Sequence, residues 1–283
     1  MAARYTTTPV LRKVSDLFVN EIGRPLYHYT GIGSLLGISK TKSLWASNVY
    51  YLNDSKEIIQ ACDVMDDVLK PMLIFGGNEP NKIFLAQFKE WAESFRRETY
   101  NLFVFSLSEE PSLLSQWRSY TPHGKGVSIG LSPETLNRLV QYCDVKLAKC
   151  IYARHEQENV LSELIQMLLT TFQQKVHEID VTKAHPTQCY HPFLETFRGD
   201  VLQVLSMIKH EAFKEEQEWR LISNYYPNYT LPAVKFREGA SMLVPYIELP
   251  LGENKPYFQG VLLGPSPHPN LSNSALSMFL SNQ

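Results

Sequence analysis

The sequence lacks an excess of charge of either sign. Its 283 residues include 27 Lys and Arg and 29 Asp and Glu, which gives a formal net charge of −2 at pH 7. Proteins that bind nucleic acid through their overall electrostatic field carry a clear basic excess. Composition therefore gives no indication of nucleic-acid binding, and only a local basic patch would support it.

Cysteine is scarce, and its spacing does not match the common metal or disulfide patterns. Cys62, Cys143, Cys150 and Cys189 form neither C-x-x-C nor C-x-x-H. Zinc sites and disulfide scaffolds are recognised by such regular spacings. We therefore expect reduced thiols and no metal site.

Long apolar runs are absent as well. No segment approaches the ~20 apolar residues that a membrane-spanning helix needs. Residues 1–18 contain no apolar core of signal-peptide length. We expect a cytoplasmic protein that does not bind membranes.

The glycine motifs that cradle phosphates are also missing. The sequence G-I-G at 31–33 would need a third glycine at position 36 to form a dinucleotide fingerprint, and that position is Leu36. No Walker sequence occurs either. A doubly wound nucleotide-binding fold is therefore not indicated.

The chain instead contains short strands mixed with helices, without strict alternation. Strands are predicted at 26–30, 43–52, 101–108, 124–131, 144–152, 219–225, 231–238, 242–249 and 257–264. Helices are predicted at 31–42, 54–69 (ended by Pro71), 80–99, 113–120, 156–177, 192–210 and 272–281, with a short one after Pro133. This mixture favours an α+β fold with mostly antiparallel sheets. We expect residues 1–25 to be an N-terminal extension and residues 26–283 to be a single domain with helical insertions.

Residues 213–222, FKEEQEWRLI, place acidic side chains at the start of a predicted strand. Because a strand alternates its faces, Glu218 shares a face with Arg220 and Ile222. Two interpretations are open. Arg220 neutralises Glu218 as a structural ion pair, or the carboxylate is held rigidly at a functional site.

Two segments near the N-terminus also carry candidates. The strand predicted at 26–30 places His28 and Thr30 on one face, although a lone strand histidine is more often structural than functional. In N-D-S-K-E, residues 53–57, Asp54 and Glu57 match a capping box at a helix N-terminus. Alternatively, Asn53 or Asp54 lines a cleft.

A third candidate segment spans residues 105–131. Ser106 and Ser108 lie on one face of a predicted strand, and Gln116 and Tyr120 share a helix face. Aromatic residues with a hydroxyl suit stacking on a flat heterocycle, and they equally suit plain packing.

In their order along the chain, these motifs resemble a bacterial family. L-Y-H-Y-T, S-L-W-A-S, L-N-D-S-K-E, F-S-L-S, Q-W-R-S-Y, FKEEQEWRLI and V-L-L-G-P follow one another. The arrangement resembles the family known as domain of unknown function 2971 over residues 26–280. LNDSKE and FKEEQEWRLI are its most specific parts, and the family name assigns no activity.

A more distant resemblance implies a chemistry. The early H-x-T strand and the late strand-edge glutamate are similar to ADP-ribosyltransferases of the diphtheria-toxin and poly(ADP-ribose) polymerase type. This resemblance implies a split, mostly antiparallel β-sheet core and NAD as the substrate. It implies that His28 binds the adenosine ribose and that Thr30 supports the nicotinamide side. Glu218 would bind the 2′-hydroxyl of the nicotinamide ribose.

The same resemblance extends to further residues. Glu216 would be the outer acid of an E-x-E pair, Tyr51 or Tyr120 would stack on nicotinamide, and Arg220 would orient Glu218. The expected NAD-binding residues are His28, Thr30, Tyr51, Asn53, Ser106, Tyr120 and Arg220, with Glu218 and Glu216 as the catalytic acids.

We therefore expect a NAD-consuming ADP-ribosyltransferase or NAD glycohydrolase, of the kind used as a bacterial toxin or defence effector. Its acceptor, a protein or a nucleic acid, is not identified. Two alternatives stay open: a non-catalytic nucleotide- or protein-binding module of the same fold, and a metal-dependent nuclease in which Asp54, Glu57 and Glu218 surround a metal. The transferase requires His28 and Glu218 across one cleft, whereas the nuclease requires clustered carboxylates.

Overall fold

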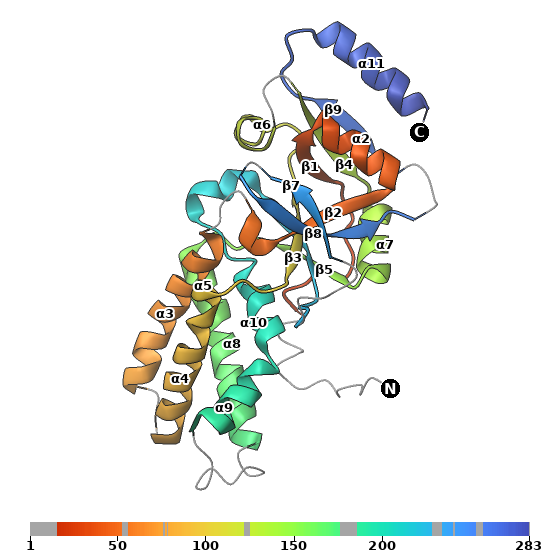
Figure 1. Cartoon of the computed structure of the whole chain (residues 1–283). Helices are drawn as coiled ribbons and strands as arrows, with labels where there is room; N and C mark the ends of the chain where they lie inside the picture. The colour runs from red at the N-terminus through yellow and green to blue at the C-terminus, as the bar shows by residue number, and fades with distance from the viewer. Residues whose placement is uncertain are drawn as a thin grey trace.

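The computed structural model describes residues 16–52, 56–75, 77, 79–121, 125–175, 186–227, 234–239, 241–252 and 257–282. Figure 1 shows a twisted sheet with helices packed around it and a bundle of helices extending from one side. The last part of the expected N-terminal extension packs on this body. Phe18 and Ile22 are buried, and the Val19 amide donates to the Leu147 carbonyl.

The sheet is antiparallel throughout. Within the described residues its strands are β1 (Leu26–Gly31), β2 (Ser43–Asn48), β3 (Phe103–Ser108), β4 (Gly126–Leu131), β5 (Val145–Lys149), β6 (Glu218–Ser223), β7 (Val234–Glu238), β8 (Leu243–Pro250) and β9 (Gly260–Leu263). They follow the order β7-β8-β2-β3-β1-β4-β9, with β6 paired to β3 and β5 paired to β6. All of these pairings are antiparallel. The predicted mixture of helices with a mostly antiparallel sheet is confirmed.

The sheet divides beside β3. One edge of β3 pairs with β6 from Val104 to Ser108. The opposite edge pairs with β2 at Val104 and with β1 at Ser108. Because two strands share this edge, β1 and β2 separate at Ser106, and the backbone there is free to bond a side chain.

The helices fall into a bundle and a set that covers the sheet. The described helices are α2 (Ile32–Thr41), α3 (Glu57–Phe75), α4 (Glu79–Ala92), α5 (Ser94–Arg97), α6 (Leu114–Tyr120), α7 (Pro133–Tyr142), α8 (Arg154–Lys175), α9 (Pro186–Glu195), α10 (Arg198–Leu205) and α11 (Pro269–Ser281), with 3-10 turns η1 (Val49–Tyr51) and η3 (Glu211–Glu216). In Figure 1, α3, α4, α8 and α9 run together as the bundle. Its core is rich in aromatic residues, including Phe84, Phe88 and Phe172, whereas a second apolar cluster joins the sheet to α2 and α7.

Three of the predicted helices are wrong in their bounds. The helix predicted at 80–99 is two helices, α4 and α5, which are separated at Glu93. The helix expected to end at Pro71 continues to Phe75. Met72 and Leu73 pack against the bundle core, and their burial offsets the hydrogen bond that the proline cannot make. The helix predicted at 192–210 is two helices, because the Thr196 backbone amide and hydroxyl both donate to the Phe193 carbonyl and close the last turn of α9.

The end of the strand predicted at 43–52 is also wrong. The chain leaves β2 at Asn48 and forms the turn η1. The Asn48 side chain accepts from the Tyr50 amide at 3.0 Å and donates to the Tyr100 carbonyl at 2.9 Å. These local bonds compete with strand pairing. They direct the chain toward α3, whose first residue contributes to the site.

The aromatic core of the bundle gives a stability prediction. Phe88→Ala should lower the free energy of unfolding by about 3–5 kcal/mol, because Phe88 is fully buried and its removal leaves a cavity. Phe75→Ala is the control, since Phe75 is 82% exposed at the end of α3. Urea unfolding of both variants measures the difference. Equal losses would contradict the packing described.

Candidate active site

A cavity of about 390 Å³ is lined by β1, β2, β3 and β6, at the place where β1 and β2 separate. Of the predicted site residues, His28, Thr30, Tyr51, Ser106, Tyr120, Glu218 and Arg220 line it. Glu216 lines an adjoining cavity of about 50 Å³, and Asn53 and Asp54 lie outside the described residues. The structure thus brings the early histidine and the late glutamate to one cavity, while their chemical roles stay predictions.

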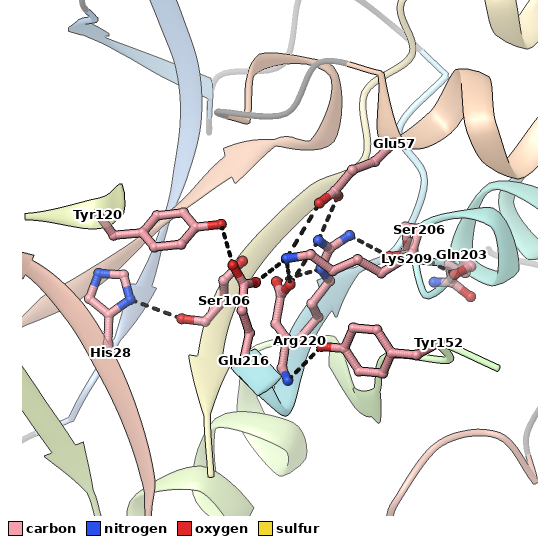
Figure 2. A network of polar contacts seen from close by, with 11 residues as sticks. His28, Glu57, Ser106, Tyr120, Tyr152, Gln203, Ser206, Lys209, Glu216 and Arg220 are labelled. Carbon is pink, nitrogen blue, oxygen red and sulfur yellow. Dashed lines mark hydrogen bonds and ion pairs between the residues drawn. The ribbon is translucent and has the colours of Figure 1, made fainter. Parts of the chain in front are cut away.

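A cluster of buried ions lines this cavity and the adjoining one. We refer to Glu57, Lys209, Glu216, Glu218 and Arg220 as the ion cluster (Figure 2). Each of these residues is at most 5% exposed. Three carboxylates therefore face two cations away from water, in an environment where an unpaired charge is very costly.

Arg220 lies at the centre of the ion cluster and is 1% exposed. Its Nε donates to Glu218 Oε1 at 2.7 Å, and its Nη2 donates to Glu57 Oε2 at 2.6 Å. Its Nη1 donates to the Ser206 carbonyl at 2.6 Å. Each of the three guanidinium nitrogens thus donates a hydrogen bond (Figure 2). The acceptors lie at the start of α3, just after α10 and at the start of β6.

Lys209 is the second cation of the ion cluster. Its Nζ lies 2.5 Å from Glu218 Oε2 and 3.6 Å from Glu57 Oε1, and it also bonds Glu216 Oε2. The backbone fixes this residue, because the Lys209 amide donates to the Ile151 carbonyl and the Gln157 side chain donates to the Lys209 carbonyl at 2.8 Å. Lys209 therefore holds three carboxylates together from a segment that has little freedom to move.

The backbone between η3 and β6 lets two acids in the ion cluster bond the same lysine. Glu216 and Glu218 flank Gln217, which adopts a left-handed conformation with φ 44° and ψ 49°. This conformation is uncommon for a residue with a side chain. The turn is fixed further by Ser108, whose hydroxyl donates to the Glu216 carbonyl at 2.7 Å.

The pKa values of Glu216 and Glu218 are shifted in opposite directions. Burial would raise the pKa of Glu218, but Arg220 and Lys209 outweigh it and hold the pKa at about 2. Burial raises the pKa of Glu216, and Lys209 does not fully compensate. Glu218 is therefore ionised at neutral pH, whereas Glu216 is the carboxyl of the two that takes up a proton more readily. The Tyr120 hydroxyl donates to Glu216 Oε1 at 3.4 Å.

His28 lies on β1, opposite the ion cluster in Figure 2. Its ring stacks on Phe105 at 4.2 Å, and its Nδ1 is 2.9 Å from the Ser106 carbonyl oxygen. A carbonyl only accepts, so Nδ1 carries the proton. Burial lowers the pKa of His28 to about 4, against a smaller raising effect of the Ser106 bond. The imidazole is neutral at pH 7, which leaves Nε2 as a hydrogen-bond acceptor.

The comparison with family models identifies part of the chain. Residues 116–221 match the model of the family described as a protein of unknown function, DUF2971. No curated protein and no solved structure matches the chain. The resemblance predicted from the sequence motifs is confirmed over this segment.

The DUF2971 segment contains four of the five members of the ion cluster, and the fifth, Glu57, precedes it. Two members were not predicted as partners of Glu218. Lys209 stands in the sequence I-K-H at 208–210, shortly before FKEEQEWRLI, and this position was the available signal. Glu57 was interpreted as part of a capping box. Its carboxylate instead binds Arg220, so the capping interpretation does not describe the side chain.

The nuclease alternative involves Asp54, Glu57 and Glu218, and Asp54 lies outside the described residues. Glu57 and Glu218 each bind Arg220, so these carboxylates face a cation of the chain. Among the described residues, no three His, Cys, Asp or Glu side chains are placed to hold a metal ion. Within the same part of the chain, no helix has the length and apolar character needed to cross a membrane.

The opposite shifts of the two acids give a prediction about acid stability. Because the folded pKa of Glu218 is lowered, its contribution is present above the ordinary value of 4.5 and is lost as pH falls toward about 2. Glu218→Gln should cost about 3–5 kcal/mol at pH 7, since it leaves a buried cation with one partner fewer. It should also flatten the loss of stability on acidification.

Glu216→Gln is the matched variant. Because the folded pKa of Glu216 is raised, its contribution is present below the ordinary value of 4.5 and is lost as pH rises through the folded value. The variant should therefore cost less at pH 7 than Glu218→Gln. Urea unfolding of the wild type and both variants between about pH 7 and pH 2.5 tests this. Equal losses at pH 7 would contradict the opposite shifts.

Proposed function

We propose that this protein binds NAD in the cavity and cleaves the bond between nicotinamide and ribose, as an ADP-ribosyltransferase or a NAD glycohydrolase. The observation that carries the proposal is that His28 and Glu218 line one cavity where β1 and β2 separate. The DUF2971 match assigns no activity and is neutral on this point.

His28 suits a ribose hydroxyl. In the neutral imidazole, Nδ1 donates to Ser106 and Nε2 accepts. A ribose hydroxyl donates a hydrogen bond to such an acceptor, and the bond to the Ser106 backbone fixes the ring orientation. Thr30, on the same strand and lining the same cavity, adds a hydroxyl beside it.

Glu218 suits the reacting end of NAD. It is ionised at neutral pH, and Arg220 and Lys209 hold its carboxylate in one orientation. Oε1 accepts one hydrogen bond, from Arg220 Nε, and keeps a lone pair for the 2′-hydroxyl of the nicotinamide ribose. The fixed negative charge then stabilises the positive charge that develops at the anomeric carbon.

The reaction would break the bond between nicotinamide and ribose and form one new bond to the ribose. As the glycosidic C–N bond breaks, its electron pair passes to the ring nitrogen of nicotinamide, which leaves as a neutral molecule. Water, or a nucleophile of a protein or nucleic-acid acceptor, forms the new bond to the anomeric carbon and loses its proton. Tyr51 and Tyr120 line the cavity and offer rings for the nicotinamide.

One observation favours a second candidate, binding without cleavage. Both carboxylate oxygens of Glu218 already hold cations, since Oε1 bonds Arg220 and Oε2 bonds Lys209. Neutralised in this way, Glu218 would fix the ligand but contribute less charge to the transition state. The protein would then be a nucleotide-binding module of the same fold.

The cleavage proposal predicts nicotinamide release from NAD by the purified protein. Glu218→Asp keeps the charge but withdraws the carboxylate by about one bond length, and such a displacement costs about 10²-fold in rate. Glu248→Asp, a surface acid paired with Lys235, is the matched control and should keep full turnover. Chromatographic assay of nicotinamide, with melting temperatures of both variants, gives the comparison. A wild type that binds NAD but releases no nicotinamide supports the binding module instead.

The neutral state of His28 predicts the pH dependence of NAD affinity. With a pKa of about 4, His28 stays neutral from about pH 8 to pH 6, so the dissociation constant should be constant over that range. It should rise below about pH 5, because protonation turns Nε2 from an acceptor into a donor. His28→Gln keeps an acceptor that does not titrate and should remove the change. Calorimetric titration at several pH values tests this, and a transition near pH 6.5 would contradict the buried neutral state.

A further inference from the structure

The cavity contains a cation that the ion cluster does not use. Lys209 and Arg220 line the cavity but are compensated by three carboxylates. Arg237 also lines it. Among the described residues, the lysines and arginines that line the cavity are Lys209, Arg220 and Arg237. Arg237 differs from the other two because no carboxylate of the described residues lies within 4.0 Å of it.

Arg237 is held in place by one neutral contact. It lies on β7 at the edge of the sheet, and its Nη2 donates to Ser47 Oγ on β2 at 3.0 Å. Since β8 lies between β7 and β2, the side chain extends across β8. The guanidinium has five N–H donors, so most of them remain for a ligand. Burial lowers the pKa of Arg237, as expected for a cation without an acidic partner.

The charge of Arg237 also affects His28, the residue predicted to bind ribose. Burial is the largest cause of the low pKa of His28, and the charge of Arg237 lowers that pKa further. The guanidinium therefore lies within electrostatic reach of the imidazole, on the same cavity. A group bound between them would meet one cation and one neutral hydrogen-bond acceptor.

The cavity is thus divided by charge. The ion cluster contributes three acids and two bases, so phosphate is disfavoured there. Arg237 bonds Ser47 on β2, which pairs with the edge of β3 opposite to β6, so its positive charge lies away from the ion cluster. Its neighbour Glu238 also lines the cavity but is exposed, and it does not form an ion pair with Arg237. A planar guanidinium binds phosphate oxygens in pairs.

We propose that Arg237 is the phosphate-binding residue of this cavity, and that the pyrophosphate of the dinucleotide lies against it. The inference rests on the proposed function for the identity of the ligand, and it adds a requirement for phosphate. Ligands that carry the nicotinamide and ribose without phosphate lose this contact. The uncharged or cationic end of the ligand then faces the ion cluster.

The experiment uses inorganic pyrophosphate, NAD and nicotinamide riboside as probes, with calorimetric titration of the full chain. Arg237→Gln should raise the dissociation constants of pyrophosphate and NAD by about 10- to 100-fold, the range for charged hydrogen bonds. The affinity for nicotinamide riboside should not change. Arg237→Lys should retain part of the affinity for pyrophosphate, because it keeps the charge but not the planar fork.

Lys235→Gln is the matched control. Lys235 lies on the same strand, is exposed and pairs with Glu248. The substitution therefore removes the same charge at a position that does not line the cavity. It should leave all three affinities unchanged. Pyrophosphate that binds the wild type and Arg237→Gln equally, or that does not bind the wild type, overturns the inference.

The outcome for Arg237 is separable from the outcome for cleavage. If the wild type releases no nicotinamide but pyrophosphate binding depends on Arg237, the cleavage proposal fails and the anion site stands. If nicotinamide is released while NAD affinity does not depend on Arg237, the anion site fails and the cleavage proposal stands.

Discussion

The buried guanidinium of Arg220 is the interaction on which the rest of this structure depends. Removing an arginine from water costs several kcal/mol unless every donor finds a partner. Here the partners come from three places: Glu57 at the start of α3, Ser206 after α10, and Glu218 at the start of β6. The helical bundle and the sheet are therefore joined by ionic contacts as well as by apolar packing. A shift of either part would leave a charge without compensation.

The same constraint determines the electrostatics of the cavity. Because Lys209 and Arg220 are occupied by carboxylates, they contribute rigidity to the wall and little free positive charge. Arg237, which has no carboxylate within 4.0 Å among the described residues, then supplies the free positive charge of the cavity, and His28 stays neutral. This separation of charge would orient a ligand with unlike ends. It would do so without a glycine-rich phosphate loop, which the sequence lacks.

The fold could be predicted from local patterns more completely than the site. Alternation and turn residues located the strands, but not the turn at Val49–Tyr51, where the Asn48 side chain bonds the backbone. The pairing of Glu218 with Arg220 was predictable because they are two residues apart on a strand. The contact between Glu57 and Arg220 was not predictable, since 163 positions separate them and nothing in either local sequence indicates it. Resemblance to a transferase brought His28 and Glu218 together, whereas composition and spacing alone did not.

The ion cluster also constrains how this chain can evolve. Its five members are buried and share partners, so a single substitution at Glu57, Lys209, Glu218 or Arg220 leaves a buried charge with fewer partners. Glu216, whose pKa is raised by burial, is less costly to replace. Single substitutions at the other positions therefore destabilise the fold. An apolar replacement of the whole cluster could fold equally well. Related sequences should consequently keep Glu57, Lys209, Glu218 and Arg220 together or replace them together. Arg237, with one neutral contact inside the described chain, is free of that coupling and can change by itself when the ligand changes.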